Sequence, residues 1–180
     1  MRTLQSAPRY GIVEPGFNVE ARSDQELDVR KRVADPFVCA AFIVAENVLG
    51  ETPVKGSVSL QSRSFGAGLV GIEVGVTGMI EGQVRFVMSD RTARRLAFAL
   101  TGTSVRVLDE MAESAIAEFA NMICGHGLLH LGELGEGCRL RPAVVFRRES
   151  ESAPRSSRFL LVPLLTRRGE ISVEIDLNAA

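Results

Sequence analysis

A short stretch of the chain sets four polar or small residues at spacings of four, three and four. On a helix, which turns by about 100° per residue, these spacings place the four side chains in one row along one face. The row consists of Ser114, Glu118, Asn121 and Gly125. A carboxylate accepts hydrogen bonds and an amide both donates and accepts them. The row therefore offers a polar strip on which a partner can dock.

An apolar stripe runs along nearly the opposite face of the same predicted helix. It consists of Ala112, Ile116, Phe119 and Ile123. An apolar face opposite a polar one is typical of any amphipathic surface helix, so the pattern alone does not require a function. Two residues favour one: Asn121 is a poor mid-helix residue without a capping role, and an exposed Gly125 costs roughly 1 kcal/mol relative to alanine. We therefore predict that this face is a docking surface.

Two other patterns suggest ligand sites, and both have simpler explanations. His126 and His130 stand four residues apart near Cys124, but no third metal ligand follows at a suitable spacing. Histidines near a helix C-terminus are also favoured by the helix dipole. The glycines between residues 66 and 82 lack the Gly-Lys-Ser/Thr sequence of a phosphate-binding loop. The sequence therefore predicts no metal site.

The N-terminal part of the chain predicts an extension followed by a helix. Residues 1–34 mix charge with Pro, Gly and Ser and show no sustained apolar period, so we predict a flexible N-terminal extension. Asp35-Pro36 is typical of a helix start, with an N-cap followed by proline at the first helical position, and Gly50 is typical of its end. At this chain length we expect a single domain, over residues 35–180.

Alternating apolar residues then predict about six strands, joined by turns and by a polar linker at 149–157. They cover residues 54–60, 69–76, 83–88, 138–147, 158–166 and 170–177. Two helices separate the first three strands from the last three: one begins at Ser89 or Asp90 and stops at Gly102, and the other runs from near Asp109 to about Leu131. This order predicts an α+β fold, with a largely antiparallel sheet and helices packed on one face.

The composition excludes several classes of protein. A net charge of −1 without long runs of like charge argues against nucleic-acid binding. The longest apolar run, Phe37 to Val44, is far shorter than the roughly 20 residues of a membrane span, and the N-terminus lacks the apolar core of a signal peptide. We therefore expect a cytoplasmic protein. Cys39 and Cys124 lie in apolar helical patterns, which is typical of cysteines that act as small hydrophobic residues.

The segment from Ser114 to Gly125, followed by Arg141-Pro142, resembles the signature of the CheC/CheX/FliY family of bacterial chemotaxis phosphatases. That signature has Asp or Ser, then Glu four residues later, Asn three residues further and a proline about twenty residues downstream. Residues 35–60 and 76–99 also resemble the opening helix and strand and the central unit of the family. The N-terminal extension is not part of the resemblance.

The resemblance implies a phosphatase that acts on the aspartyl phosphate of a CheY-like response regulator. Asn121 would orient the attacking water, and Glu118 would pair with a cationic side chain of the regulator. Ser114 and Gly125 would shape the surface that meets the partner. The resemblance implies no cofactor of the chain's own, because Mg²⁺ would come from the regulator.

Family members with two active sites repeat the motif in an earlier helix. Here that helix keeps Asn47 but has Val44 where the glutamate would stand, so we predict a single active site, as in CheX-like members. Members of that kind dimerise, and the final strand pair, 159–166 and 171–177, offers an expected sheet edge for a homodimer. The sequence leaves open a binding module of the same fold that recognises a response regulator without hydrolysing it.

Overall fold

Two long strands with alternating apolar residues form the centre of the structure, a computed structural model that describes residues 19–62, 68–148 and 158–179. The strands are β1 (Val54–Lys55), β2 (Ser59–Gln61), β3 (Leu69–Gly78), β4 (Ile80–Ser89), β5 (Cys138–Leu140), β6 (Val144–Arg148), β7 (Phe159–Thr166) and β8 (Gly169–Ala179). The helices are α1 (Val19–Val44), the π-helical turn η1 (Ala45–Leu49), α2 (Asp90–Thr101), α3 (Glu110–His130) and α4 (Glu133–Glu136).

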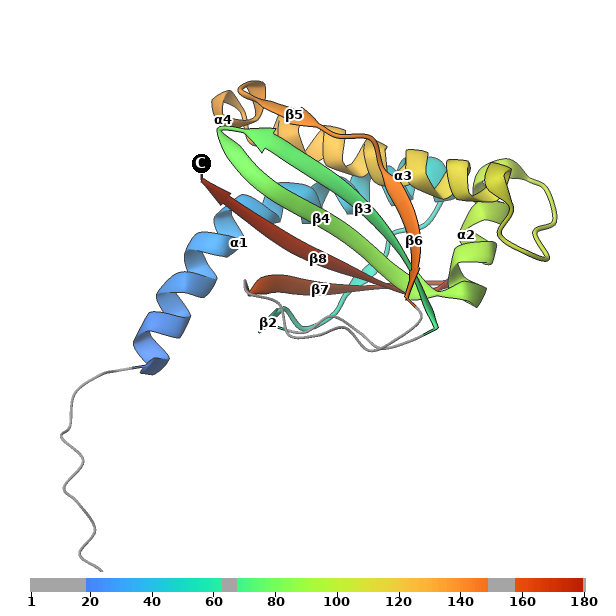
Figure 1. Cartoon of the computed structure of the whole chain (residues 1–180). Coiled ribbons are helices and arrows are strands. Elements are labelled where there is room, and N and C mark those ends of the chain that lie inside the picture. The colour runs from blue at the N-terminus through green and yellow to red at the C-terminus, as the bar shows by residue number, and fades with distance from the viewer. Residues whose placement is uncertain (1–18, 63–67, 149–157, 180) are drawn as a thin grey trace, which may run out of the picture.

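The sheet has the order β1-β7-β8-β4-β3-β5, with β2 also paired to β7 and β6 also paired to β3. Every pairing among the described residues is antiparallel. Figure 1 shows α1 and α3 together behind this sheet, so the helices cover one of its faces. The predicted α+β fold is confirmed.

Eight strands replace the six that we predicted, because two of the predicted strands are interrupted. Between β1 and β2 the ladder breaks at Gly56, which donates to the carbonyl of Pro163 at 2.8 Å, and Pro163 has no N–H to return a bond. Between β5 and β6 the ladder along β3 breaks at Arg141-Pro142, where Pro142 has no N–H to donate and the register shifts by one residue. The predicted turn at 64–66 and the linker at 149–157 lie outside the described residues.

The predicted open edge at the last two strands is wrong. β8 pairs with β4 on one side and β7 on the other, and β7 pairs in turn with β1 and β2. The sequence predicts a strand over residues 54–60 but not its pairing with β7, because local alternation does not indicate which strands lie side by side.

The first helix starts earlier than Asp35-Pro36 predicts. It begins at Val19 and continues through Pro36 to the π-helical turn that ends at Gly50, whose φ of 64° suits a glycine stop. Ala34 and Phe37 are both fully buried, so packing on either side of the proline offsets the hydrogen bond that it removes. Figure 1 shows the N-terminal part of α1 extending beyond the sheet. Residues 1–18 of the expected extension lie outside the described residues.

The two later helices begin and end where the sequence predicts. The Ser89 hydroxyl accepts from the N–H of Thr92 at 3.1 Å, and the Asp109 carboxylate accepts from the N–H of Ala112 at 2.9 Å. These caps satisfy backbone N–H groups that the first turn of each helix leaves unpaired. The short helix α4 follows α3 after Gly132, which has a φ of 61°, and was not predicted.

Among the described residues no helix is long and apolar enough to cross a membrane. The apolar run from Phe37 to Val44 instead lies in α1 and contributes five buried residues to the core. Cys124 is buried as expected, whereas Cys39 is exposed, so the prediction that both act as core residues is wrong for Cys39.

The two glycines of α3 lead to a stability prediction. A Cβ on Gly127 would lie 2.4 Å from Cδ1 of the Phe37 ring, whereas a Cβ on Gly125 meets nothing within 4 Å. We expect Gly127→Ala to destabilise the fold by about 1–3 kcal/mol through overpacking against α1. The matched variant Gly125→Ala should stabilise it by up to about 1 kcal/mol through helix propensity. Urea unfolding measures both, and equal effects would contradict the packing of α1 on α3.

Candidate functional site

The predicted row lies on the outer face of α3. Ser114 and Glu118 are exposed, and Asn121 and Gly125 are partly exposed. All four therefore share the solvent side of one 21-residue helix. The structure brings together every member of the row that the sequence predicts.

The rotation of α3 about its axis is determined by the opposite face. Ala112, Ile116, Phe119 and Ile123 are between 0% and 4% exposed, and all belong to the main core. Full burial of each of the larger side chains contributes about 1.5–3 kcal/mol. Because any rotation that hides the polar row would expose this stripe, the row is held toward solvent.

Glu118 and Asn121 lie next to one another on this surface. The Nδ2 of Asn121 is 3.5 Å from Oε2 of Glu118, a long hydrogen bond along the i, i+3 direction of the helix. With one N–H directed at the carboxylate, the amide keeps its second N–H and its carbonyl oxygen for another partner. Among the described residues no basic side chain forms an ion pair with Glu118, so its charge is also available to a partner.

Gly125 has no structural reason to lack a side chain. Space for a Cβ is open, and its helical backbone suits alanine better than glycine. This distinguishes it from Gly127, where the Phe37 ring leaves no room. The missing side chain at residue 125 instead leaves the helix backbone accessible beside Asn121.

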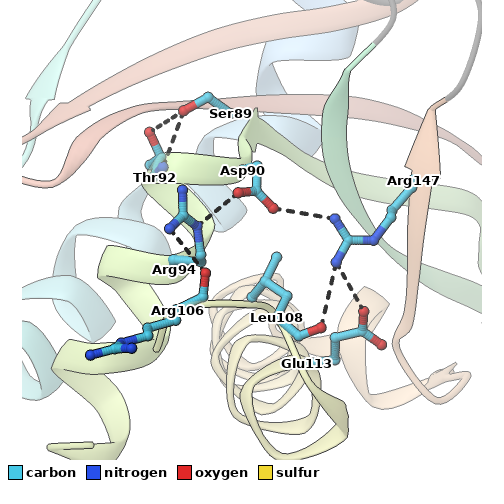
Figure 2. A network of polar contacts seen from close by, with 8 residues as sticks. All are labelled: Ser89, Asp90, Thr92, Arg94, Arg106, Leu108, Glu113 and Arg147. Atoms are coloured by element: carbon cyan, nitrogen blue, oxygen red, sulfur yellow. Dashed lines mark hydrogen bonds and ion pairs between the residues drawn. The ribbon is translucent and has the colours of Figure 1, made fainter. Parts of the chain in front are cut away.

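A polar network holds the N-terminal end of α3 against α2 and β6 (Figure 2). Asp90 accepts from Arg94 at 2.7 Å and from Arg147 at 3.2 Å. The Arg147 guanidinium also lies 3.7 Å from the Glu113 carboxylate and donates to the carbonyl of Leu108 at 3.5 Å. These side chains are between 35% and 47% exposed, so each pair contributes at most about 1 kcal/mol.

The network connects three elements around the start of α3. It joins the first residue of α2, the edge strand β6 and the turn of α3 that precedes Ser114. Sequence reasoning missed it, because Asp90 and Arg147 are far apart in the chain and no local pattern pairs them. Only the pairing of β6 with β3 places Arg147 on the helix side of the sheet.

The alternative metal site does not fit the positions of the cysteine and the two histidines that would form it. Cys124 is fully buried, and this burial raises the pKa of its thiol well above the ordinary value, so the thiol stays protonated. His126 and His130 are exposed, and their side chains do not join Cys124 in the core. Within the described ranges, no three His, Cys, Asp or Glu side chains gather in a grouping able to hold a metal ion.

The earlier helix differs from α3 at the matching positions. Val44 is 1% exposed and belongs to the core, while Asn47 lies exposed on the π-helical turn η1. A glutamate in place of Val44 would therefore bury its charge. The earlier helix therefore presents no exposed pair at Val44 and Asn47 like that of Glu118 and Asn121.

The downstream Arg141-Pro142 of the motif lies at the sheet. Arg141 donates its N–H to the carbonyl of Gly75 at 2.8 Å, and its side chain packs over that glycine. Gly75 faces away from the buried, helix-covered side that Val74 and Val76 occupy. The Arg141 side chain therefore lies across the sheet from α3.

Comparisons with known proteins match this chain to one family. The sequence model of the family described as "Chemotaxis phosphatase CheX" matches residues 70–165. A protein named CheY-P phosphatase CheX, from Thermotoga maritima, is 32% identical over 116 residues, which is 63% of this chain and 74% of that protein.

Solved structures share the fold. The chemotaxis protein CheX of Desulfovibrio desulfuricans superposes with a TM-score of 0.69 at 22% identity, covering 83% of this chain and 99% of that one. CheX in the CheX-CheY-BeF3-Mg²⁺ complex of Borrelia burgdorferi superposes with a TM-score of 0.67 at 24% identity, covering 81% and 97%. The family match and the Thermotoga relative show that this chain belongs to the CheX family of chemotaxis phosphatases.

Proposed function

We propose that this chain hydrolyses the aspartyl phosphate of a CheY-type response regulator. The observation that carries the proposal is the exposed pair of Glu118 and Asn121, which lie 3.5 Å apart on a helix whose rotation is set by its core face. The name of the Thermotoga relative and the partner in the Borrelia complex support the same substrate class.

Asn121 supplies the chemistry in this proposal by orienting water. The water oxygen forms a bond to phosphorus while the bond from phosphorus to the aspartyl carboxylate oxygen breaks. The products are orthophosphate and the free aspartate, and the protons of the water pass to phosphate and solvent. An amide suits this task because its carbonyl accepts a hydrogen bond from the water and its remaining N–H donates one. Positioning, rather than proton abstraction, then lowers the barrier.

Glu118 anchors the regulator. Its carboxylate is exposed and lacks a basic partner among the described side chains, so it can receive a lysine or arginine from the regulator. When it does, the long contact to Asn121 places the amide beside the same insertion point. Ser114 and Gly125 flank the pair and form the partner-binding surface.

Magnesium belongs to the regulator in this proposal. Mg²⁺ requires a site rich in oxygen ligands. The row contains only one carboxylate, and the described residues contain no group of three His, Cys, Asp or Glu side chains that could hold a metal ion. When bound to the regulator, the ion neutralises charge on the phosphoryl oxygens.

We further propose a homodimer and a cytoplasmic location. Since β7 and β8 are interior, pairing between copies is assigned to β6, the longest strand at either edge of the described sheet, where Val144 is 59% exposed. The cytoplasmic location is supported by three free cysteines, which persist in a reducing compartment.

The proposed hydrolysis is tested by phosphate release from a phosphorylated CheY-like receiver. Wild type should shorten the lifetime of the phosphorylated receiver, and Asn121→Ala should lower kcat by about 100-fold, because the water loses its orientation. If wild type binds a receiver from the same genome but accelerates the hydrolysis of none, the protein is a binding module. Wild-type rates in Asn121→Ala would contradict the residue assignment.

Glu118→Ala should act on binding. Loss of a charged hydrogen bond costs about 1.5–3 kcal/mol, so KM should rise by about 10- to 100-fold. Glu118→Gln is the matched variant, because it keeps the shape of the side chain and removes the charge. An unchanged KM in both variants would exclude an ionic anchor at this position.

Gly125→Ala separates folding from function. The extra methyl meets no atom of this chain, so the variant should be at least as stable as wild type while its kcat/KM falls about 10-fold as the partner backbone is held away. Unfolding and phosphate release on the same preparation measure the two effects. Unchanged kcat/KM would place the partner away from residue 125.

The dimer is tested by light scattering at micromolar concentration. We expect a mass of about twice the 19.5 kDa of one chain. Val144→Lys should reduce this to a single chain, because charge on an edge strand opposes pairing between sheets. A monomeric wild type would remove the proposal.

A further inference from the structure

Two exposed apolar side chains stand at the ends of the row on α3. Met111 precedes Ser114 by one turn, and Leu129 follows Gly125 by one turn. At about 100° per residue, both fall about 20° beyond the Glu118 side of the arc that the row occupies. Met111 is 60% exposed and Leu129 is 77% exposed, whereas the residues of the core stripe on the same helix are at most 4% exposed. The exposed side of α3 therefore presents Met111, then the polar row, and then Leu129.

Leu129 also borders a hollow of about 280 Å³ at the junction of α3 and α4. The lining residues are Gly125, Leu128, Leu129, Gly132, Gly135 and Glu136. A single water occupies about 30 Å³ of liquid, so this hollow is large enough for a side chain. Because Gly125 belongs both to the hollow and to the row, the hollow continues the polar surface around Asn121.

Three of the residues that line the hollow are glycines, and the structure explains why two of them lack a side chain. Gly132 has a φ of 61°, and a Cβ on Gly135 would lie 1.8 Å from the carbonyl oxygen of Leu128. Gly125 has neither constraint. Two glycines thus shape the hollow for reasons of backbone geometry, while the third keeps it open toward the row.

We infer that the receiver domain on which Asn121 acts covers the whole stripe from Met111 to Leu129 and places an apolar side chain in the hollow beside Leu129. This inference rests on the proposed function. Along the helix axis Met111 lies about 15 Å from Asn121 and Leu129 about 12 Å, from a rise of about 1.5 Å per residue. A compact domain of about 100 residues has a radius of gyration of about 13 Å, which corresponds to an outer radius of about 17 Å for a sphere. A receiver centred on Asn121 therefore reaches both ends.

Leu129 and Met111 would add to the affinity that the Glu118 anchor supplies. Burial of an exposed leucine side chain corresponds to about 10-fold in affinity or more. The two apolar ends would then strengthen the hold on the receiver, and the hollow would select which apolar side chain fits. Glu136 on its rim adds a negative charge that disfavours an acidic residue at that point.

The test compares Leu129→Ser and Met111→Ser with Val54→Ser, a control at a 64% exposed valine on β1. KM for a phosphorylated receiver should rise about 10-fold in each α3 variant, with kcat and the melting temperature unchanged, and the control should match wild type. An active wild type with unchanged KM in both variants would overturn this inference and leave the proposed function intact.

Direct binding covers the case in which wild type does not hydrolyse any receiver. Titration with a receiver activated by beryllium fluoride and Mg²⁺ should show about 10-fold weaker binding for Leu129→Ser, and this would support the docking surface even if catalysis fails. Equal affinity for the variant and wild type would overturn it. A change in the mass of the oligomer with unchanged receiver affinity would assign the stripe to a second copy of this chain, which also overturns it.

Discussion

The account of this protein depends on the burial of one apolar stripe. Ile116, Phe119 and Ile123 pack into the core beneath α3, and their burial sets the rotation of the helix about its axis. That rotation alone decides which residues reach solvent, because a shift of one residue turns the face by about 100°. The polar row is exposed as a consequence of what lies beneath it.

The sheet supplies the surface on which that stripe packs. Apolar residues of β3, β4 and β8 face the helices in register, and the network around Asp90 and Arg147 joins the start of α3 to a distant strand. Surface pairs of this kind add little stability, and here they connect the start of α3 to β6. A site that works by positioning water depends on how firmly α3 is held, since a displacement of about 1 Å lowers the rate of a positioned reaction markedly.

Local patterns in the sequence predicted most of the fold and the placement of the row on α3, and long-range pairing explains what they missed. The 3.6-residue period of α3 and its Asp109 cap fixed both faces of the helix in advance, so the row was predicted residue by residue. The predicted helix start at Asp35-Pro36 was wrong, because the N-cap and proline signals are local. Ala34, which precedes them, is held in the helix by core packing that no local signal indicates. The hidden edge of β7 and the pairing of Arg147 depend on strands far apart in sequence, which composition and periodicity do not relate.

The central claim is that Asn121 acts on the chemical step and Glu118 acts on binding. The most direct measurement is single-turnover dephosphorylation of a receiver at increasing excess of wild type, Asn121→Ala or Glu118→Ala. The account predicts that saturation restores the rate constant of Glu118→Ala toward wild type and leaves Asn121→Ala slow. Recovery of Asn121→Ala at saturation, with Glu118→Ala still slow, would contradict it.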